Sequence, residues 1–407
     1  SAFQSAGQRC SAQRVLYIQE DVYDEMVTMI RGAFQALVVG DPTEFATDVG
    51  PVIDHDAQAA LERHVARSAT IGRTIWRADD DPAFARGSFV LPTIIEIEGI
   101  GHLQRENFGP VLHIAKFKNK DLEKVVDDIN ALGYGLTCGL HSRVEATRRL
   151  VESKIKVGNF YVNRNQIGAV VGSQPFGGEG LSGTGPKAGG PHYLRRFRRA
   201  AQRQSPTGEG ETATAAMIAE HFPDNQRGGW ATRADRVGAL RKLLRGKAAD
   251  AVSAAAGLDA GPYDLPAPTG EANTLMLVPR GRVLCLGPDP DLLLMQAVQA
   301  LAIGNAVLAV APGATAALQP LLSKGLPLGA LDGIVSPETL TAIAVDGVAC
   351  AAEEVNQRAL RQALAAREGP IVPLIAETLA PAAYAHERAV CVDTTAAGGN
   401  ASLLAAA

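Results

Sequence analysis

The feature that most constrains the fold is a compact strand–helix–strand pattern in the second half of the chain. The apolar runs Val283–Leu286 and Ala306–Val310 predict two strands, and Asp291–Ile303 predicts a helix between them that ends at Gly304-Asn305. Strands joined in this way lie parallel, with the helix covering the sheet. Shorter apolar runs near 332–335, 347–349, 371–374 and 389–393 also predict strands. We therefore expect a small Rossmann-like, doubly wound domain over residues 231–390.

The first half of the chain shows the same alternation. Its apolar periodicity predicts strands over 89–97 and 111–117 and helices over 20–37, 56–68, 121–131 and 145–154. The fold class is therefore α/β with mostly parallel strands. The arginine-rich stretch 195–199 and the polar Gly/Pro stretch 204–211 interrupt the pattern, and a helix is predicted from Arg233 to Ala255 with Thr232 as its N-cap. The predicted organisation is a domain over 1–195, a linker over 196–230, the domain over 231–390 and a tail over 391–407.

Composition excludes several classes of protein. The net charge is −4, and the Arg195–Arg199 cluster has no aromatic-interleaved basic face around it, so we expect no nucleic-acid binding. The five cysteines include no C-x-x-C pair, which argues for a reducing cytoplasm and against disulfides or a metal site. No apolar run has the length of a membrane span.

Cys10 has the setting of a nucleophile. The segment before it, Phe3–Arg9, predicts the end of a helix, and Val15–Ile18 predicts a strand. A cysteine at such a junction can have free backbone N–H groups beside it, which stabilise a thiolate and later an oxyanion. For a lone cysteine the alternative is a buried structural residue.

Several motifs then resemble those of one family. Gly7-Gln8-Arg9-Cys10-Ser11 resembles the nucleophile segment of the aldehyde dehydrogenase superfamily, and Glu106-Asn107-Phe108-Gly109-Pro110 resembles its E-x-F-G-P cofactor segment. Gly133–Thr137 and Gly158–Asn163 resemble later landmarks in the right order. The more specific stretch Pro175–Pro191 resembles the L-glutamate γ-semialdehyde dehydrogenase module of proline utilization A proteins. The resemblance implies that residues 1–195 are the C-terminal part of an aldehyde dehydrogenase catalytic domain.

The resemblance also implies a reaction. L-Glutamate γ-semialdehyde, which comes from 1-pyrroline-5-carboxylate in proline catabolism, would be oxidised to L-glutamate with NAD through a thiohemiacetal and a thioester on Cys10. Glu106 would accept hydrogen bonds from a ribose diol, and Phe108 would form an apolar wall beside the nicotinamide. Asn107 departs from the family's usual Val or Ile. An oxyanion-binding Asn and the general-base Glu would lie upstream of residue 1.

The substrate residues are predicted from the loop Ile167–Phe176. Small residues expose backbone N–H groups, which can cradle a carboxylate. By resemblance, Gly168 and Ala169 would donate N–H groups to the α-carboxylate of the semialdehyde, Ser11 would offer a hydroxyl, and Phe176 would pack on the methylene chain. The alternative is a glycine-rich turn before a strand.

The second half resembles the family's cofactor domain without its cofactor groups. Gly287-Pro288-Asp289-Pro290 and Ala311-Pro312 replace the expected Pro-Trp-Asn and Lys-Pro, and Asp289 and Asp291 would repel a pyrophosphate. We expect a degenerate, non-catalytic copy whose tail, from Thr394 to Leu403, helps to cover the catalytic unit and supports substrate channelling.

The expected partners are the small-molecule substrate, upstream NAD-binding and proline dehydrogenase domains, and further copies of the chain in a homo-oligomer; FAD would belong to the proline dehydrogenase domain alone. On this interpretation the chain is the C-terminal piece of a bifunctional enzyme and inactive by itself. A non-catalytic scaffold or lid and a different semialdehyde dehydrogenase remain the alternatives.

Overall fold

The computed structural model describes residues 1–197, 204–224, 227–258 and 260–395, and these form two compact units. The first unit consists of residues 1–169 together with the segment that begins at Val392. The second unit is Val170–Cys391. The predicted boundary at residue 195 stays a prediction. Parts of the predicted linker and most of the predicted tail, including the stretch from 396 to 403, lie outside the described residues.

The first unit contains a four-stranded sheet in the order β1-β4-β3-β2. Its strands are β1 (Val15–Gln19), β2 (Arg73–Arg77), β3 (Thr93–Ile97) and β4 (Val111–Phe117). β4 pairs in parallel with both β1 and β3, and only β2 at the edge runs antiparallel. The parallel pairing of β1 with β4 places the segments that follow Cys10 and Gly109 side by side.

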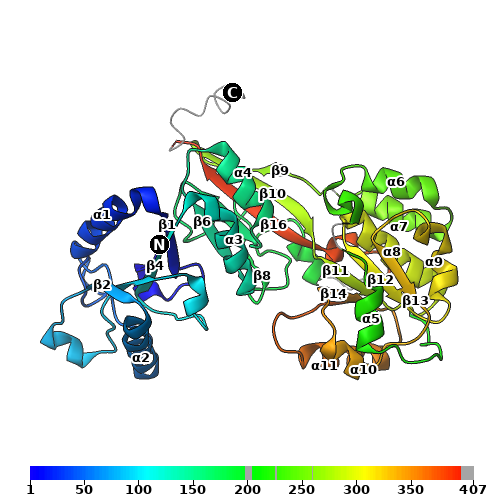
Figure 1. Cartoon of the computed structure of the whole chain (residues 1–407), viewed down its shortest axis with the longest axis horizontal. Coiled ribbons are helices and arrows are strands. Elements are labelled where there is room, and N and C mark those ends of the chain that lie inside the picture. Colours follow the sequence, from blue (N-terminus) through cyan, green and yellow to red (C-terminus); the bar gives the residue numbers. More distant parts are fainter. Residues whose placement is uncertain (198–203, 225–226, 259, 396–407) are drawn as a thin grey trace. The chain divides into compact units, whose positions relative to one another are not determined.

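Two helices cover the faces of this sheet, α1 (Tyr23–Gln35) and α2 (His55–Ile71) (Figure 1). Val27, Ile30 and Phe34 recur at helical spacing on α1 and join the cluster that contains Ile94 and Ile114. On the other face Val65 of α2 joins Ile95, Val111 and Ala115. Because side chains alternate along β3 and β4, each strand supplies both clusters, and the sheet is buried on both sides.

The rest of the first unit is a second small α/β element. β6 (Thr137–Leu140) pairs in parallel with β7 (Asn159–Val162), and α3 (Leu122–Ala131) and α4 (Glu145–Lys154) pack against each other. β5 (Tyr134–Gly135) is a two-residue strand in the same unit.

The second unit has a five-stranded sheet that is parallel throughout, in the order β13-β12-β11-β14-β15. Its strands are β11 (Arg282–Cys285), β12 (Ala306–Val310), β13 (Leu328–Leu331), β14 (Gly347–Ala349) and β15 (Leu374–Ile375). The strand order reverses between β11 and β14. A reversal of this kind defines a doubly wound fold and marks the place where such folds bind ligands.

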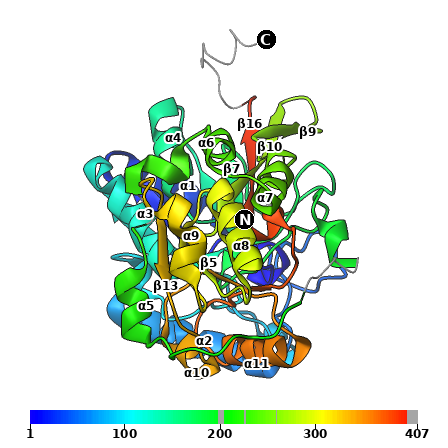
Figure 2. The same cartoon turned by 90° about the vertical axis from the view of Figure 1, so that its right-hand side faces the viewer.

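Helices lie on both faces of this sheet. One layer holds α6 (Arg236–Leu243), α7 (Lys247–Ala256), α8 (Pro290–Ile303) and α9 (Ala314–Leu322); the other holds α5 (Ala215–His221), α10 (Pro337–Ala342) and α11 (Glu354–Ala365). Figures 1 and 2 show α10 and α11 together, with α8 and α9 on the opposite layer. α8 is apolar nearly all round and buried, as a helix in the middle of a core should be.

The remaining strands of the second unit are β8 (Glu179–Gly180), β9 (Tyr263–Leu265), β10 (Glu271–Pro279) and β16 (Ala385–Asp393), which begins in this unit. β9 and β10 are antiparallel, and β10 lies between β9 and β16. Within the described residues, the 3₁₀ turns are Gln4–Gly7, Glu20–Val22, Pro82–Arg86, Ile100–His102, Asn119–Asp121, Tyr193–Phe197, Arg227–Thr232 and Pro381–Tyr384.

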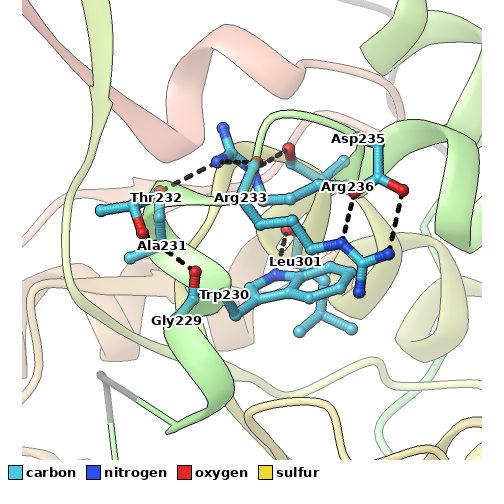
Figure 3. A network of polar contacts seen from close by, with 9 residues as sticks. Gly229, Trp230, Ala231, Thr232, Arg233, Asp235, Arg236 and Leu301 are labelled. Atoms are coloured by element: carbon cyan, nitrogen blue, oxygen red, sulfur yellow. Dashed lines mark hydrogen bonds and ion pairs between the residues drawn. The ribbon is translucent and has the colours of Figure 1, made fainter.

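The helix predicted from Arg233 to Ala255 is wrong, because two helices replace it. α6 begins after Asp235, and Gly246, at φ +61°, separates it from α7. Figure 3 shows the network before α6: the hydroxyl of Thr232 donates to Gly229 O at 3.1 Å and does not cap the helix. Arg236 donates instead to the carbonyls of Ala231, at 2.9 Å, and Arg233, at 2.7 Å.

Candidate functional site

The nucleophile turn, residues 7–12, places Cys10 at the surface and Ser11 in the interior. Cys10 is exposed, whereas Ser11 is 4% exposed. Ala12 N donates to Arg9 O at 3.0 Å and so closes the turn around Cys10. Among the described residues no acceptor takes the N–H of Cys10 or of Ser11. The buried-cysteine alternative is therefore wrong for Cys10, and the turn can offer N–H groups to an oxyanion.

The segment before the turn differs from the predicted helix end. Residues 4–7 form a 3₁₀ turn in which Ser5, Ala6 and Gly7 have φ of 55°, 51° and 66°. Such backbone costs energy for a residue with a Cβ, so tertiary contacts must hold it.

The left-handed backbone at Gly7 is in contact with the cofactor loop, residues 106–110. A Cβ on Gly7 would lie 2.1 Å from the carbonyl oxygen of Gly109, and a Cβ on Gly109 would lie 2.4 Å from the Leu61 side chain. The two loops therefore touch through their backbones, with α2 directly behind. This brings together the two motifs that the sequence predicted to share a site.

Within the cofactor loop, Glu106 and Phe108 are both exposed, and Phe108 has 43% of its surface accessible. The guanidinium carbon of Arg14 lies 4.7 Å from the centroid of the Phe108 ring. Partial burial raises the pKa of Glu106, and the charge of Arg14 opposes that shift. An accessible carboxylate and an accessible aromatic ring suit a ribose diol and a nicotinamide ring, so the residues present fit a dinucleotide.

Arg14 is a residue of this site that the sequence analysis did not single out. Its Nη1 donates to Gly7 O at 2.6 Å and to Gly109 O at 3.4 Å, and its Nη2 donates to Arg9 O at 3.3 Å. Burial lowers the pKa of Arg14, while Glu106 and Cys10 raise it. One cation thus touches both loops; no local motif around residue 14 could have revealed it.

A buried histidine pair lies behind Arg14. His113 Nδ1 is 3.0 Å from Arg14 O, and its Nε2 is 3.0 Å from His64 Nε2. Burial is the main cause that lowers both pKa values, that of His64 to about 4. Both rings are therefore neutral near pH 7, and His113 donates from Nδ1 to the carbonyl while His64 donates to His113 Nε2. The pair therefore fixes the backbone of Arg14.

The predicted carboxylate cradle lies at the end of the first unit. Gly168 and Ala169 are exposed, and Gly168 has φ +79° with open space where a Cβ would stand, no atom lying within 4 Å of that point. Among the described residues no acceptor takes the N–H of either residue. Two free N–H groups on a left-handed backbone form the kind of concavity that binds anions.

Phe176 belongs to the second unit, in the stretch Pro175–Pro191. It pairs with Ala188 in an antiparallel bridge, with N···O distances of 3.0 and 2.9 Å. Lys187 next to Ala188 is 2% exposed; its Nζ donates to Gly177 O and its backbone N–H to the carboxylate of Glu387. Burial lowers the pKa of Lys187 to about 7, with Glu387 and Glu179 opposing the shift. The stretch is thus fixed by buried polar contacts.

The second unit was predicted to lack a cofactor site. In the cofactor domain that it resembles, the site would lie at the turn after β11 and the N-terminus of α8. After β11, Gln296 donates to Gly287 O at 2.9 Å and accepts from Gly287 N at 3.0 Å. Asp289 caps α8 by accepting from Leu292 N at 2.9 Å, and also accepts from Ser205 Oγ at 2.8 Å. A carboxylate of the chain itself therefore occupies the helix N-terminus where a pyrophosphate would bind.

The segment from Ser205 to Ala213, which we call the strap, crosses this same edge of the sheet. It bridges to Ala352 after β14 and to Ile334 after β13. Between these points Gly208 lies close enough to Pro312, after β12, that a Cβ would be 3.1 Å from the ring. The strap was predicted to be part of a linker; its described residues are built into the second unit.

Comparisons with known proteins agree with the motifs of the first unit. Residues 1–202 match the model of the aldehyde dehydrogenase family. The bifunctional protein PutA of Escherichia coli K12 is 42% identical over 432 residues, which cover 99% of this chain and 31% of that protein. The 1-pyrroline-5-carboxylate dehydrogenase of Geobacillus kaustophilus is 40% identical over 196 residues, 48% of this chain and 37% of that protein. The chain therefore spans about a third of the length of these relatives.

A solved structure extends the likeness to the fold of nearly the whole chain. The structure of proline utilization A from Corynebacterium freiburgense covers 97% of this chain and 36% of its own, with a TM-score of 0.61 and 21% sequence identity. The α/β fold predicted from the sequence is confirmed.

Proposed function

Since the chain belongs to the aldehyde dehydrogenase family through residues 1–202, we propose that it forms part of an NAD-dependent L-glutamate γ-semialdehyde dehydrogenase in proline catabolism. The observation that carries the proposal is the backbone contact between Gly7 and Gly109, which puts the turn of an exposed cysteine against a loop that fits a dinucleotide. The names of the relatives, PutA and 1-pyrroline-5-carboxylate dehydrogenase, support the choice of substrate.

Cys10 begins the reaction as the nucleophile. Its thiolate adds to the aldehyde carbon, and the carbonyl oxygen becomes an oxyanion of the thiohemiacetal. The N–H groups of Cys10 and Ser11, which have no acceptor among the described residues, would donate to this oxyanion. NAD, which Glu106 and Phe108 would help to hold, would supply the hydride acceptor for the oxidation of this carbon.

Loss of the hydride converts the thiohemiacetal into a thioester on Cys10. Water then adds to the thioester carbon, the carbon–sulfur bond breaks, and the carboxylate product leaves with the thiol regenerated. Glu106 would orient the ribose and Phe108 the nicotinamide during the first half of the reaction. We propose that the base activating the water is supplied by the longer protein.

The substrate is proposed to carry its α-carboxylate in the cradle of Gly168 and Ala169. Their two exposed N–H groups suit an anion and give an uncharged aliphatic aldehyde nothing comparable. Ser11 and Phe176 are proposed to contact the same substrate through a hydroxyl and a ring face. The predicted roles of these residues remain proposals.

We further propose that the chain works inside a longer polypeptide that also holds the NAD-binding domain and, as the PutA name indicates for its relatives, a second activity. FAD would belong to that second activity. A homo-oligomer, substrate channelling and a cytoplasmic location remain predictions. None of the helices in the described part of the chain is long and apolar enough to span a bilayer.

The second unit is proposed to be a non-catalytic copy of the cofactor domain. Asp289 at the α8 N-terminus and the strap over the carboxyl edge of its sheet argue against a second dinucleotide site. This proposal concerns dinucleotides alone.

The test uses the longer protein with a panel of aldehydes and NAD. We expect NADH formation to be most efficient, by kcat/KM, with L-glutamate γ-semialdehyde. A higher kcat/KM for succinate semialdehyde would contradict the substrate, and no NADH from any aldehyde would favour a scaffold role.

A further inference from the structure

We infer that Arg14 is a positioning residue, which holds the nucleophile turn and the cofactor loop at the spacing that hydride transfer requires. The inference rests on the proposed function and adds a residue to it. The hydrogen bonds of the Arg14 side chain go to backbone carbonyls of the two loops, so it acts on the loops and not on the reacting atoms.

These hydrogen bonds connect segments far apart in the sequence. Gly7 O and Arg9 O, at 2.6 and 3.3 Å, belong to the nucleophile turn, and Gly109 O, at 3.4 Å, belongs to the cofactor loop 95 residues away from Arg14. The same guanidinium lies over the Phe108 ring at 4.7 Å. The carbonyl that flanks Cys10 and the ring proposed to face the nicotinamide are thus fixed to one rigid, planar group.

The backbone of Arg14 is itself held by hydrogen bonds, which fix the position from which its side chain extends. His113 donates to Arg14 O from its backbone N, at 3.0 Å, and from Nδ1, at 3.0 Å. Both bonds come from β4, a central strand of the sheet. Loops attached to such a base cannot drift apart without breaking bonds to a half-buried cation, which are among the stronger hydrogen bonds in proteins.

The spacing between these two loops matters most for the hydride-transfer step. The hydride leaves a carbon attached to Cys10 and reaches a ring beside Phe108, so an error in loop separation appears directly in the transfer distance. A misplacement of about 1 Å can cost roughly 10²-fold in rate. Thiol addition to the aldehyde involves only the nucleophile turn, and should be less sensitive.

Arginine is suited to this task and lysine is not. A guanidinium presents several N–H groups in a fixed plane and stacks on an aromatic ring, whereas an ammonium is a compact point charge on a flexible stem. Lysine at position 14 would keep the charge near Cys10 and lose the simultaneous bonds to both loops. This difference separates a positioning role from a purely electrostatic one.

The experiment compares Arg14→Met, Arg14→Lys and the control Arg31→Met in the longer protein. Arg31 is exposed on α1 of the same unit, away from both loops in the sequence. The kinetic measurement is kcat with the semialdehyde carrying hydrogen or deuterium on its aldehyde carbon. The second measurement, which needs no activity, is amide hydrogen exchange in peptides covering residues 5–13 and 105–110.

For Arg14→Met we expect kcat to fall about 10–100-fold and the deuterium isotope effect on kcat to increase, because hydride transfer becomes slower than the other steps. Exchange should accelerate in both peptides and not elsewhere in the sheet. Arg14→Lys should show most of both defects, and Arg31→Met should stay within about twofold of the parent in kcat.

Two outcomes would overturn the inference: unchanged exchange in the 105–110 peptide, or a loss of kcat with an unchanged isotope effect and faster exchange throughout the unit, which marks general destabilisation. If the parent oxidises a different aldehyde, the proposed substrate fails, and the exchange data still decide the role of Arg14.

Discussion

The buried carboxylate of Glu387 accepts a hydrogen bond from the backbone N–H of Lys187, 200 residues earlier in the chain. The side-chain nitrogen of the same lysine donates to Gly177 O, so both ends of the residue are fixed inside the second unit. Burial lowers the pKa of Lys187 and raises that of Glu387, and each group partly opposes the shift of the other. The stretch Pro175–Pro191, which resembles the semialdehyde dehydrogenase module, is therefore held by buried ionisable groups.

This arrangement predicts a pH-dependent stability. The pKa of Lys187 is about 7 in the folded protein, against an ordinary value of 10.5. Between these values the unfolded chain binds a proton that the folded chain does not, so the free energy of unfolding rises with pH over that window. Lys187→Met should flatten the rise in Tm measured from pH about 7 to about 9.

The control for this measurement is Lys324→Met, because Lys324 is exposed on the same unit. That variant should keep the parent's rise in Tm. A slope for Lys187→Met as steep as that of the parent would contradict the buried, neutral lysine.

A second prediction concerns the contact between the two loops of the site. In Gly7→Ala the new Cβ would meet Gly109 O at 2.1 Å on a backbone with φ +66°, so we expect a loss of roughly 3 kcal/mol in the free energy of unfolding. Gly168→Ala shares the left-handed backbone, at φ +79°, and has free space, so it should cost roughly 1 kcal/mol. Urea unfolding measures both, and equal losses would show that the loop contact is not tight.

Elements with strong local signals were predicted well from the sequence. The apolar run of β12 and the amphipathic run of α4 have the predicted bounds, 306–310 and 145–154, because pattern and burial agree there. The strand predicted at 332–335 lies instead at Leu328–Leu331, where Pro327 and Gly329 lower the β-propensity of the sequence. The ladder with β12 outweighs that propensity.

The residues of the candidate site also differ in whether a local sequence pattern predicts them. Cys10, Glu106 and Phe108 stand in motifs, so the sequence alone could propose them. Arg14 acts on carbonyls of Gly7, Arg9 and Gly109, and any residue type offers a carbonyl. Such a role depends on how β1 and β4 are paired, which no local pattern encodes.

A third prediction is that Cys10 is the cysteine that reacts first. It is exposed, whereas burial raises the pKa of Cys138 to about 12 and keeps that thiol protonated. Iodoacetamide at neutral pH should modify Cys10 on the order of tenfold faster than Cys138, as peptide mass spectrometry would record.

In the longer protein, Cys10→Ala should abolish aldehyde oxidation and retain NAD binding, while Cys138→Ala keeps activity. Turnover in the Cys10 variant would refute the assigned nucleophile.

A fourth prediction tests the carboxylate cradle. Gly168→Val should raise KM for L-glutamate γ-semialdehyde by about tenfold or more and that for an aliphatic aldehyde by about threefold at most, because only the first substrate uses the N–H groups. Gly172→Val is the matched control, since Gly172 also has a left-handed backbone, φ +83°, with free space around a Cβ. If both variants raise KM for both aldehydes alike, distortion of the loop explains the loss and the cradle does not.

The last prediction concerns the closed edge of the second unit. Gln296 is 3% exposed and satisfies both the N–H and the carbonyl of buried Gly287, at 3.0 and 2.9 Å. Gln296→Leu keeps an apolar side chain of similar size in the core but leaves the buried N–H of Gly287 without an acceptor, while the carbonyl of Gly287 keeps its hydrogen bond from Ala351 N at 2.9 Å. An unpaired buried group costs roughly 1–3 kcal/mol, so we expect a loss of about 1–3 kcal/mol in urea unfolding. The exposed Gln362 of α11 provides the control, because Gln362→Leu should change stability by about 0.5 kcal/mol at most. A neutral Gln296→Leu variant would mean that water reaches Gly287, and the edge would then be open enough to admit a ligand.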